Sequence, residues 1–218
     1  MSILFSINQY QTNHTGEGFG MNTPQSSLFV VSAPTGGGKT TLVVRVLAKF
    51  GSTLPITKAI TYTTRPARPG EINGKDYFFL SKEDFLNKKA NGFFLETTQY
   101  DDQWYGSPIN LMDEIKNGKS YILVTDRPGA KTIKALIPKA ILIWIGVPNL
   151  DVVIHRLKNR GTEQCEQLAR RVNLAAHEIE DEQNHPLFKY HIINRDLNEA
   201  VAELAYIMTQ ELQGHAPS

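Results

Sequence analysis

Cysteine is almost missing from this chain, because Cys165 is the only one among 218 residues. The sequence therefore cannot form an internal disulfide, and a lone thiol suits a reducing compartment. The six histidines show neither HExxH nor another paired spacing typical of metal ligands, so no structural metal site is expected. Residues 1–27 contain no Lys or Arg, and their apolar opening, Ile3-Leu4-Phe5, is too short for a signal peptide or a membrane span. We therefore expect a cytoplasmic protein.

An excess of charge of either sign is also missing. Lys and Arg number 23 against 22 Asp and Glu, which leaves a net charge of +1. This balance gives no global field that would attract nucleic acid or an anionic membrane, so any site for a polyanion must be local. Hydrophobic residues make up 41% of the chain, enough for the core of one large domain or two small ones. Residues 1–27 are polar and without periodicity, and we expect a disordered extension.

The stretch Leu28–Leu42, LFVVSAPTGGGKTTL, predicts a strand, a loop and a helix, because an apolar run leads into a glycine-rich turn and apolar residues then recur with helical spacing to Phe50. The glycines at Gly36–Gly38 let backbone N–H groups turn inward, and the helix that starts near Lys39 adds the positive end of its dipole. In the GxxxxGK[ST] loop the lysine reaches the β- and γ-phosphates, and the next hydroxyl, here Thr40, ligates Mg²⁺. The stretch therefore predicts a phosphate-binding loop.

The motif differs from the bare pattern at Ala33, which stands at the first glycine position. A glycine-rich turn that merely joins a strand to a helix is the alternative, but the GK[ST] ending and the flanking elements favour phosphate binding. A dinucleotide-binding GxGxxG loop is excluded by its spacing, since it needs glycine where Thr41 stands. The predicted loop residues are Ala33, Pro34, Thr35, Gly36, Gly37, Gly38, Lys39, Thr40 and Thr41.

A second loop carries two arginines. After a short β-type run at Ala59–Thr63, the segment TTRPARPG places prolines at positions 66 and 69, which forbid a regular helix. Arg65 and Arg68 stand three residues apart with rigid proline spacing, and their guanidinium groups suit bidentate capture of a phosphate. A solvated basic loop is the plainer interpretation of such a pair in isolation. The phosphate loop upstream favours phosphate binding instead.

The following residues predict a small subdomain inserted after the second core strand. The expected elements are strands at Asp76–Leu80 and Phe93–Gln99, helices over Lys82–Ala90 and about Ile109–Asn117, and an aromatic turn, QWYGS, at Gln103–Ser107. Ser81 is expected to be the N-cap of the first of these helices.

From there strands and helices alternate. Strands are expected at Tyr121–Thr125, Ala140–Gly146 and His191–Ile193, and helices starting at Ala130, Leu150 and Asn198. Near-continuous apolar strands between helical segments are typical of a parallel sheet covered on both faces. With the two earlier core strands the count is five, and ligands are expected at the carboxyl ends of these strands. The sequence therefore predicts an α/β fold with a five-stranded parallel sheet.

Cationic side chains gather after the fourth core strand, at Arg156, Lys158, Arg160, Arg170 and Arg171. Gly161 joins two helical segments here, and a glycine-jointed helical pair with arginines is what a lid closing over a phosphate chain uses. An exposed helix of alternating charge is an equally good interpretation, because Glu163, Glu166 and Glu178 lie nearby. Nothing in the sequence pairs the thiol of Cys165 with a base, so no reactive role is expected for it.

Several segments resemble the guanylate kinase family in their order and spacing. These segments are VVSAPTGGGKTTL, TYTTRPARPGEINGKDYFFLS, FFLET, QWYGSP, RLKNRGT and IINRDL. The second is far more specific than the phosphate loop, which many unrelated nucleotide enzymes share. The resemblance covers about Leu28–Met208 and leaves out only the N-terminal lead and the tail.

The resemblance implies an enzyme that transfers the γ-phosphoryl group of ATP to GMP, and to dGMP as well, with Mg²⁺. The implied fold is a P-loop NTPase-type core with an inserted, mixed α/β GMP-binding subdomain and a helical lid. On this chain the domain would span residues 28–210, with the core at 28–58 and 119–210, the insertion at about 59–108, the lid at about 156–175 and a tail at 211–218. The sequence leaves open whether the protein is a monomer or a homodimer.

For the acceptor, the resemblance carries two groups of residues onto this chain. Positions that hold the GMP phosphate match Arg65, Arg68, Tyr77 and Tyr105, and positions that read guanine match Thr61, Glu96 and Ser107, with Asp126 beside them. A carboxylate can accept hydrogen bonds from both N1–H and the 2-amino group of guanine, while a hydroxyl donates to O6. Adenine presents the opposite pattern, and the unpaired groups can reject it by up to ~10⁴-fold. A plain edge-strand carboxylate is the alternative for Glu96.

For the donor, the resemblance places Lys39, Arg156, Arg160 and Arg171 around the ATP phosphates and Asn194 beside adenine. Phosphoryl transfer needs in-line positioning and positive charge on the equatorial oxygens rather than covalent help from the protein. Lid closure would also exclude water. The implied catalytic residues are Lys39, Arg65, Asp126, Arg160 and Arg171, and the implied metal ligand is Thr40.

One segment departs from the family pattern. After the third core strand the family reads acid, apolar, Asp, apolar, Gln-Gly, whereas this chain has the sequence VTDRPG at residues 124–129. Asp126 matches, but Val124 replaces the first acid and Pro128 replaces the glutamine. Both lie near the junction of the two nucleotide sites, so they favour a slower enzyme or an altered acceptor.

Two alternatives therefore stand beside the kinase hypothesis. A related kinase with another phosphorylated acceptor, such as a ribose bisphosphate phosphokinase, is favoured by the departures and disfavoured by Thr61, Glu96 and Ser107. A non-catalytic guanylate-kinase-like binding module is disfavoured by the intact Lys39 and Thr40, because such modules lack a working phosphate loop.

Overall fold

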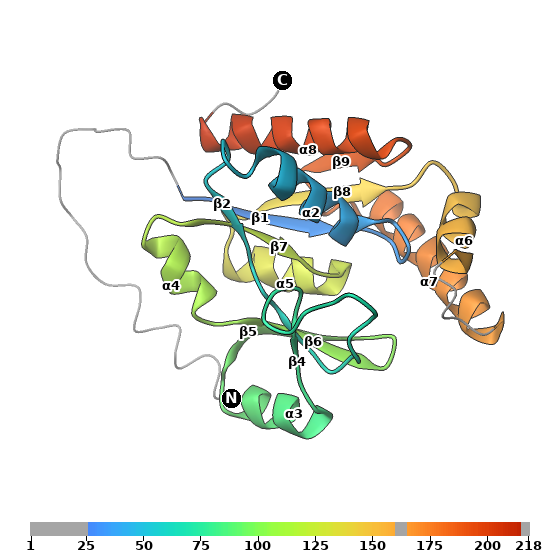
Figure 1. Ribbon diagram of the computed structural model, residues 1–218, viewed down its shortest axis with the longest axis horizontal. Coiled ribbons are helices and arrows are strands. Elements are labelled where there is room, and N and C mark those ends of the chain that lie inside the picture. The colour runs from blue at the N-terminus through green and yellow to red at the C-terminus, as the bar shows by residue number, and fades with distance from the viewer. Residues whose placement is uncertain (1–25, 160–164, 215–218) are drawn as a thin grey trace.

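Two sheets and the helices around them make up the part of the chain that the computed structural model describes, residues 26–159 and 165–214 (Figure 1). The expectations for residues 1–25 and 215–218, and for Arg160 and Gly161, lie outside the described residues. Among the described helices, none combines the length and the apolar character that crossing a bilayer requires.

The larger sheet, which we call the parallel sheet, has five strands. In spatial order they are β2 (Ile56–Lys58), β7 (Ser120–Val124), β1 (Leu28–Ser32), β8 (Ile141–Gly146) and β9 (Tyr190–Ile193). Every neighbouring pair runs parallel, with β1 in the centre between β7 and β8. The predicted α/β class with a five-stranded parallel sheet is therefore confirmed.

Alternation along β1 explains why helices cover both faces of this sheet. Phe29 and Val31 point into a core formed with α2 (Lys39–Phe50) and α8 (Leu197–Leu212). Leu28 and Val30 point into a second core on the other face, where α5 (Arg127–Leu136) packs. Figure 1 shows α2 and α8 on one side of the sheet and α5 on the other. Side chains with a period of two thus give a central strand buried on both faces.

The smaller sheet, which we call the mixed sheet, lies beyond α5 (Figure 1). Its spatial order is β4 (Phe78–Phe79), β3 (Tyr62–Thr63), β6 (Gln103–Pro108) and β5 (Phe94–Tyr100), with one parallel and two antiparallel pairs. Helix α3 (Lys82–Ala90) packs on it through Phe85, which is fully buried and stacks on Phe94 with ring centroids 4.5 Å apart. Ser81 caps this helix as expected, since its Oγ accepts a hydrogen bond from the Asp84 N–H at 3.0 Å.

The strand expected at Ala59–Thr63 is wrong as a single element. The residues that pair with β7 are Ile56–Lys58, and the Ala59 N–H donates the last bond of that ladder, to the Ile122 carbonyl at 2.9 Å. Thr61 already belongs to the other sheet, because its carbonyl accepts a bond from the Phe78 N–H. The chain therefore crosses from one sheet to the other within this β-type run, which composition alone does not reveal.

The aromatic turn expected at Gln103–Ser107 is also wrong, because these residues form most of β6. The turn lies just before them, at Asp101 and Asp102, whose φ angles of 50° and 62° are left-handed. A two-residue turn of this kind matches the twist of an antiparallel hairpin, here β5 and β6. Helix α4 (Leu111–Lys116) follows the hairpin and agrees with the helix expected near Ile109–Asn117.

Helix α5 begins at Arg127, three residues before the expected start. Asp126 is its N-cap, with Oδ1 accepting from the Gly129 N–H at 2.8 Å, and Pro128 fits the first turn because that turn needs no N–H from it. Two further helices, α6 (Leu150–Lys158) and α7 (Cys165–Asn184), pack through a small cluster that contains Val153, Leu157 and Ala175. The side chain of Cys165 is not described, so the expectation for its thiol is not tested.

Candidate active site

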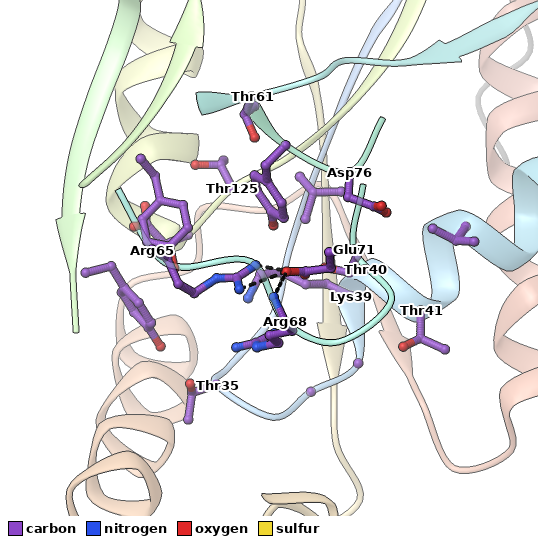
Figure 2. Close-up of a pocket in the computed structure, with 18 of the residues that line it drawn as sticks. Thr35, Lys39, Thr40, Thr41, Thr61, Arg65, Arg68, Glu71, Asp76 and Thr125 are labelled. Atoms are coloured by element: carbon purple, nitrogen blue, oxygen red, sulfur yellow. Dashed lines mark hydrogen bonds and ion pairs between the residues drawn. The ribbon is translucent and has the colours of Figure 1, made fainter. Parts of the chain in front are cut away.

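A cavity of about 680 Å³ opens at the carboxyl ends of β1 and β7, opposite the mixed sheet (Figure 2). Its walls come from residues 33–41, which we call the phosphate loop, from residues 64–71, the arginine loop, and from the mixed sheet, the end of β7 and α7. The predicted site residues that line it are Thr35, Gly36, Gly37, Gly38, Lys39, Thr40, Thr41, Thr61, Arg65, Arg68, Tyr77, Glu96, Tyr105, Asp126 and Arg171. Others of the prediction, namely Ala33, Pro34, Ser107, Arg156 and Asn194, are not part of the lining.

The glycines of the phosphate loop are needed for its shape. Gly36 and Gly38 have φ angles of 72° and 89°, which disfavour any side chain. Gly37 donates its N–H to the Pro34 carbonyl at 2.8 Å, and a Cβ on Gly37 would lie only 2.8 Å from that same oxygen. Gly38 is the N-cap of α2, so the loop delivers the positive end of this helix to the cavity. Lys39 and Thr40 stand in its first turn.

The arginine loop is closed by a carboxylate that the sequence analysis did not single out. Both terminal nitrogens of Arg65 donate to Glu71, from Nη1 to Oε2 at 2.9 Å and from Nη2 to Oε1 at 2.8 Å. The Arg68 N–H donates to Oε2 of Glu71 at 2.7 Å. Figure 2 shows dashed lines from the Glu71 carboxylate to Arg65 and to Arg68. Burial raises the pKa of Glu71, but the bonds from Arg65 and Arg68 outweigh it and lower that pKa overall.

Two tyrosines complete this side of the cavity. Cζ of Arg65 lies 5.3 Å from the ring centroid of Tyr77, and the Tyr77 and Tyr105 rings meet edge to face at 6.3 Å. Tyr77 and Thr40 line the same cavity, so the mixed sheet and the first turn of α2 face one another here. Burial is the main cause that raises the pKa of Tyr77, so its hydroxyl stays protonated and able to donate.

Glu96 is a buried carboxylate with one open acceptor. It is 6% exposed, and Oε1 accepts a bond from the Ser107 hydroxyl at 2.7 Å. Within the described part of the chain, Oε2 is buried and has no hydrogen-bond partner. Burial, followed by the nearby charge of Asp126, raises the pKa of Glu96 to about 7, against the opposing effect of the bond from Ser107. A buried acceptor of this kind is ready for a ligand that donates N–H groups.

Asp126 supports the floor beside Glu96. Its Oδ2 accepts from the Thr98 hydroxyl at 2.8 Å, and its Oδ1 caps α5. A Cβ on Gly129 would lie 2.2 Å from Oγ1 of Thr125 and 3.3 Å from Oε2 of Glu96, so the helix approaches this closely only with glycine there. Asp126 is thus fixed at the meeting point of the two sheets.

Arg156 and Asn194 hold the backbone of the phosphate loop. The Gly37 carbonyl accepts from Nη1 of Arg156 at 3.0 Å and from Nδ2 of Asn194 at 3.1 Å, and Nη2 of Arg156 donates to the Asn194 carbonyl. Burial lowers the pKa of Arg156 from its usual high value. Asn194 is 2% exposed, and its Oδ1 is buried without a partner among the described residues. Both side chains face the loop, and neither lines the cavity.

Helix α7 brings two further side chains to the site. Arg171 lines the cavity, and its Nε lies 3.8 Å from Oδ2 of Asp101 in the hairpin turn. Glu178, which the sequence analysis did not assign, accepts from the Thr35 N–H of the phosphate loop at 2.8 Å and from the Tyr100 hydroxyl at 3.3 Å. Burial raises the pKa of Glu178 and of Tyr100. Arg171 and Glu178 are seven residues apart, a spacing that places both on one face of a helix.

The two departures from the family pattern differ in their surroundings. Val124 is half-buried at the end of β7 and lines the cavity, so it presents an apolar side chain where an acid was expected. Pro128 is exposed in the first turn of α5 and is not part of the lining. Of the two, only Val124 changes the surface that a ligand meets.

Comparisons with known proteins agree with this geometry. The chain matches the family model described as guanylate kinase over residues 25–211. It is 40% identical over 188 residues to the guanylate kinase of Protochlamydia amoebophila, which covers 86% of this chain and 92% of that protein. It is 37% identical over 191 residues to the guanylate kinase of Symbiobacterium thermophilum, which covers 87% and 88%. The crystal structure of guanylate kinase from Anaplasma phagocytophilum matches with a TM-score of 0.69 at 29% identity over 87% of each chain.

Proposed function

This chain belongs to the guanylate kinase family, and we propose that its cavity holds GMP against the arginine loop and the mixed sheet, and the phosphates of ATP against the phosphate loop. The protein is a nucleoside monophosphate kinase with a P-loop NTPase fold, and it catalyses the ATP-dependent phosphorylation of GMP. An oxygen of the GMP phosphate forms a bond to Pγ as the bond from Pγ to the β–γ bridging oxygen breaks, which gives GDP and ADP. An altered acceptor and a non-catalytic binding module are not favoured.

The open Oε2 of Glu96 is the observation that carries the choice of base. Guanine offers two adjacent donors, N1–H and the 2-amino group, to a carboxylate, and Glu96 already has Ser107 on its other oxygen. Adenine has an acceptor at N1 and would leave Oε2 buried and unpaired, which is the condition under which a polar site rejects a substrate strongly. Thr61 lines the same region and supplies a further hydroxyl. We assign guanine recognition to these residues.

We assign the binding of the GMP phosphate to Arg65, Arg68, Tyr77 and Tyr105. Two guanidinium groups and two phenols line the cavity beside the first turn of α2. Guanidinium groups bind phosphate in pairs of parallel hydrogen bonds, and a phenol that stays protonated adds a donor without a charge to desolvate. Tyr77 and Thr40 both line the cavity, which places this group near the proposed site of the transferred phosphoryl group. Dianionic GMP and dGMP both fit this assignment, because it uses no contact to the ribose 2′-hydroxyl.

We assign the binding of the ATP phosphates to the phosphate loop and Lys39. The loop offers N–H groups at the positive end of α2, and Lys39 and Arg171, which both line the cavity, add positive charge. Positive charge on the equatorial oxygens of the transferred group lowers the barrier to phosphoryl transfer. We assign to Arg156 and Asn194 the additional task of fixing the Gly37 carbonyl, so that neighbouring N–H groups stay directed at the ligand.

The residues around Thr40 fit a Mg²⁺ ion that arrives with the nucleotide. The described residues contain no group of three or more His, Cys, Asp or Glu that would cage a metal. Mg²⁺ commonly keeps several waters and takes one or two protein ligands together with substrate phosphates, so one hydroxyl on the phosphate loop suffices. Thr40 would hold the ion, with Asp126 as a carboxylate in the same cavity. When bound, the ion would supply positive charge that neutralises the phosphate groups.

We also propose a division of the chain into functional parts. The core comprises residues 28–58 and 119–210, the acceptor-binding insertion is about 59–108, and the lid is about 156–175. The course of the chain supports this division, because it leaves the parallel sheet after Lys58 and returns to it at Ser120. The contact between Arg171 and Asp101 joins the proposed lid to the insertion.

A panel of acceptors tests the assignment. The purified protein with ATP and Mg²⁺ is assayed for ADP formation with GMP, dGMP, AMP, UMP and CMP as alternative acceptors. We expect rapid turnover with GMP and dGMP, and rates near background with the other three. Phosphorylation of AMP in preference to GMP would contradict the assignment of Glu96 to guanine.

A further inference from the structure

Glu71 binds two groups of the arginine loop, and Arg65, Arg68 and Glu71 all line the cavity. Its carboxylate accepts three hydrogen bonds, two from Arg65 and one from the Arg68 N–H, at 2.7–2.9 Å. The side chains of Arg65 and Glu71 are 13% and 18% exposed, so the pair is largely shielded from water. The Glu71 N–H donates to the Arg68 carbonyl at 3.0 Å, which closes the turn and fixes the carboxylate relative to the loop. Glu71 is thus a fixed anion beside both arginines.

The contacts of Arg65 occupy only part of its guanidinium. This group has five N–H bonds. Nη1 uses one for Glu71 and one for the Pro66 carbonyl at 2.7 Å, and Nη2 uses one for Glu71. No residue in the described ranges accepts the Nε–H or the second N–H of Nη2. These two N–H bonds point the same way, so they form a fork that can bind two phosphate oxygens.

The ring neighbours of Arg65 fix the remaining freedom of this group. Its Cζ lies 5.3 Å from the centroid of Tyr77 and 5.7 Å from that of Phe79. Ring faces hold a guanidinium by its plane, while Glu71 holds it by its terminal edge. With plane and edge both set, the direction of the unused Nε and Nη2 fork is set as well.

We propose, on the basis of the proposed function, that Glu71 is a positioning residue for the acceptor: it holds the terminal edge of Arg65 and the Arg68 amide so that the Nε and Nη2 edge of Arg65 receives the GMP phosphate. Glu71 and the phosphate then lie on different edges of one guanidinium and do not compete for the same N–H bonds. An arginine side chain in water has many rotamers, and holding it in one of them before binding removes that entropic penalty from the binding step. Glu71 therefore strengthens GMP binding although it carries the same sign of charge as the ligand.

The opposite role, in which Glu71 blocks the phosphate site, predicts a different change in the KM for GMP. If Glu71 merely occupied the phosphate site, its removal would release two cations for the ligand and lower the KM for GMP. The Nε and Nη2 edge of Arg65 argues against such blocking, because this edge is open while Glu71 binds the terminal edge. Kinetics of one variant decide between the two.

The experiment compares Glu71→Gln with the wild type in steady-state assays and in calorimetric titrations with GMP alone. The glutamine amide has one acceptor oxygen and presents an N–H to the guanidinium. The two-point contact with the terminal edge of Arg65 is therefore lost, while the volume of the side chain hardly changes. We expect the KM and the dissociation constant for GMP to rise about tenfold to thirtyfold, while kcat changes less than about threefold and the KM for ATP less than about twofold. Glu83→Gln is the matched control, because Glu83 is exposed on α3, and it should leave all constants unchanged.

Two further variants keep the test decisive. Glu71→Asp keeps the charge but shortens the reach, so it should raise the KM for GMP as Glu71→Gln does. In an Arg65→Ala background, Glu71→Gln should add less than about a twofold further change, since its effect passes through Arg65. Thermal unfolding of each variant shows whether it is folded, and if Glu71→Gln fails to fold, Glu71→Asp takes its place.

Three results would overturn the role of Glu71: a lower KM for GMP in Glu71→Gln, wild-type constants in Glu71→Asp, or effects of Arg65→Ala and Glu71→Gln that multiply. The proposed function is tested separately in the same experiment. If Arg65→Ala leaves the KM for GMP unchanged, the assignment of the acceptor phosphate to Arg65 fails. If Arg65→Ala raises that KM and Glu71→Gln does not, only the role of Glu71 fails.

Discussion

The acceptor and donor sides of the cavity are held in opposite ways. On the acceptor side, side chains are held by other side chains: Arg65 by Glu71, and Glu96 by Ser107. On the donor side, side chains hold the backbone: Arg156 grips the Gly37 carbonyl, and Glu178 grips the Thr35 N–H. A base and a single phosphate are recognised by particular side-chain atoms, whereas a polyphosphate chain is bound largely by N–H groups of the loop. The acceptor side therefore fixes the side-chain atoms that recognise the ligand, whereas the donor side fixes the course of the backbone that carries the remaining N–H groups.

This contrast separates the expected effects of substitution. Changes to acceptor side chains should raise the KM for GMP and leave that for ATP nearly unchanged, because the groups they hold contact only one ligand. Lys39 is the exception on the donor side, because its charge acts on the transferred group itself. Substitution of Lys39 should therefore lower kcat.

The largest effect is expected for Lys39→Ala. The substitution removes the positive charge of Lys39, which stabilises the transferred phosphoryl group most strongly in the transition state. The value of kcat should therefore fall by about 10³-fold or more. A coupled assay of ADP formation at saturating ATP and GMP measures it. Lys49→Ala, at the exposed far end of the same helix, is the control. A loss in kcat of less than about tenfold would show that the loop amides and the arginines suffice without Lys39.

Arg65→Ala should give the next largest effect, and on the acceptor side alone. It removes a fork of charge-assisted hydrogen bonds, so the KM for GMP should rise about 100-fold while that for ATP changes by less than about twofold. Initial rates over a matrix of GMP and ATP concentrations give both constants. A comparable rise in the KM for ATP would mean that the two sides are not independent.

Glu96→Ala should act on the choice of base rather than on the phosphate. Without the carboxylate, the two guanine donors lose their acceptor, and the KM for GMP should rise about 30-fold. The rate with AMP should stay near its low starting value, so the ratio of kcat/KM for GMP over AMP should fall by a similar factor. Competition assays with mixed nucleotides measure this ratio directly. An unchanged ratio would remove Glu96 from the base site.

The raised pKa of Glu96 predicts a pH dependence that belongs to the acceptor side. Guanine needs the ionised carboxylate as an acceptor, and with a pKa of about 7 the free enzyme gains a proton there as the pH falls. The KM for GMP should therefore rise roughly tenfold from about pH 7.5 to about pH 6, with little change in the KM for ATP. The GMP phosphate titrates near this range too, so Glu96→Ala is measured alongside. Only the part of the pH dependence that disappears in that variant belongs to Glu96.

The sequence predicts the acceptor and donor residues unequally. The phosphate loop and the arginine loop could be predicted because their chemistry lies in residue type and spacing: glycines followed by a lysine and a hydroxyl, and two arginines spaced by prolines. In the structure both loops line one cavity. Glu71 and Glu178 were not assigned, because a carboxylate that holds another group leaves no pattern of its own. Glu178 had one usable signal, its helical spacing from Arg171.

The fold shows the same limit. Alternating apolar strands and helices were enough to predict five parallel strands, because the central strands are buried on both faces. The crossing between the sheets near Ala59 was not predictable, since residues on either side of it have the same β-type composition and only pairing separates them. The hairpin before β6 was missed because its turn is made by Asp101 and Asp102 rather than by the usual glycine.

The smallest effect is expected where the two sides touch, at Asp101 and Arg171. Their closest atoms are 3.8 Å apart and Asp101 is partly exposed, so the pair contributes at most about 1 kcal/mol. Asp101→Asn removes the charge and keeps a side chain that tolerates the left-handed turn, and both KM values should change by less than about twofold. Asp102→Asn, the next residue of the same turn, is the control. A tenfold rise in the KM for ATP in the first variant alone would mean that the hairpin of the acceptor side positions Arg171 for the donor, and the independence of the two sides would have to be given up.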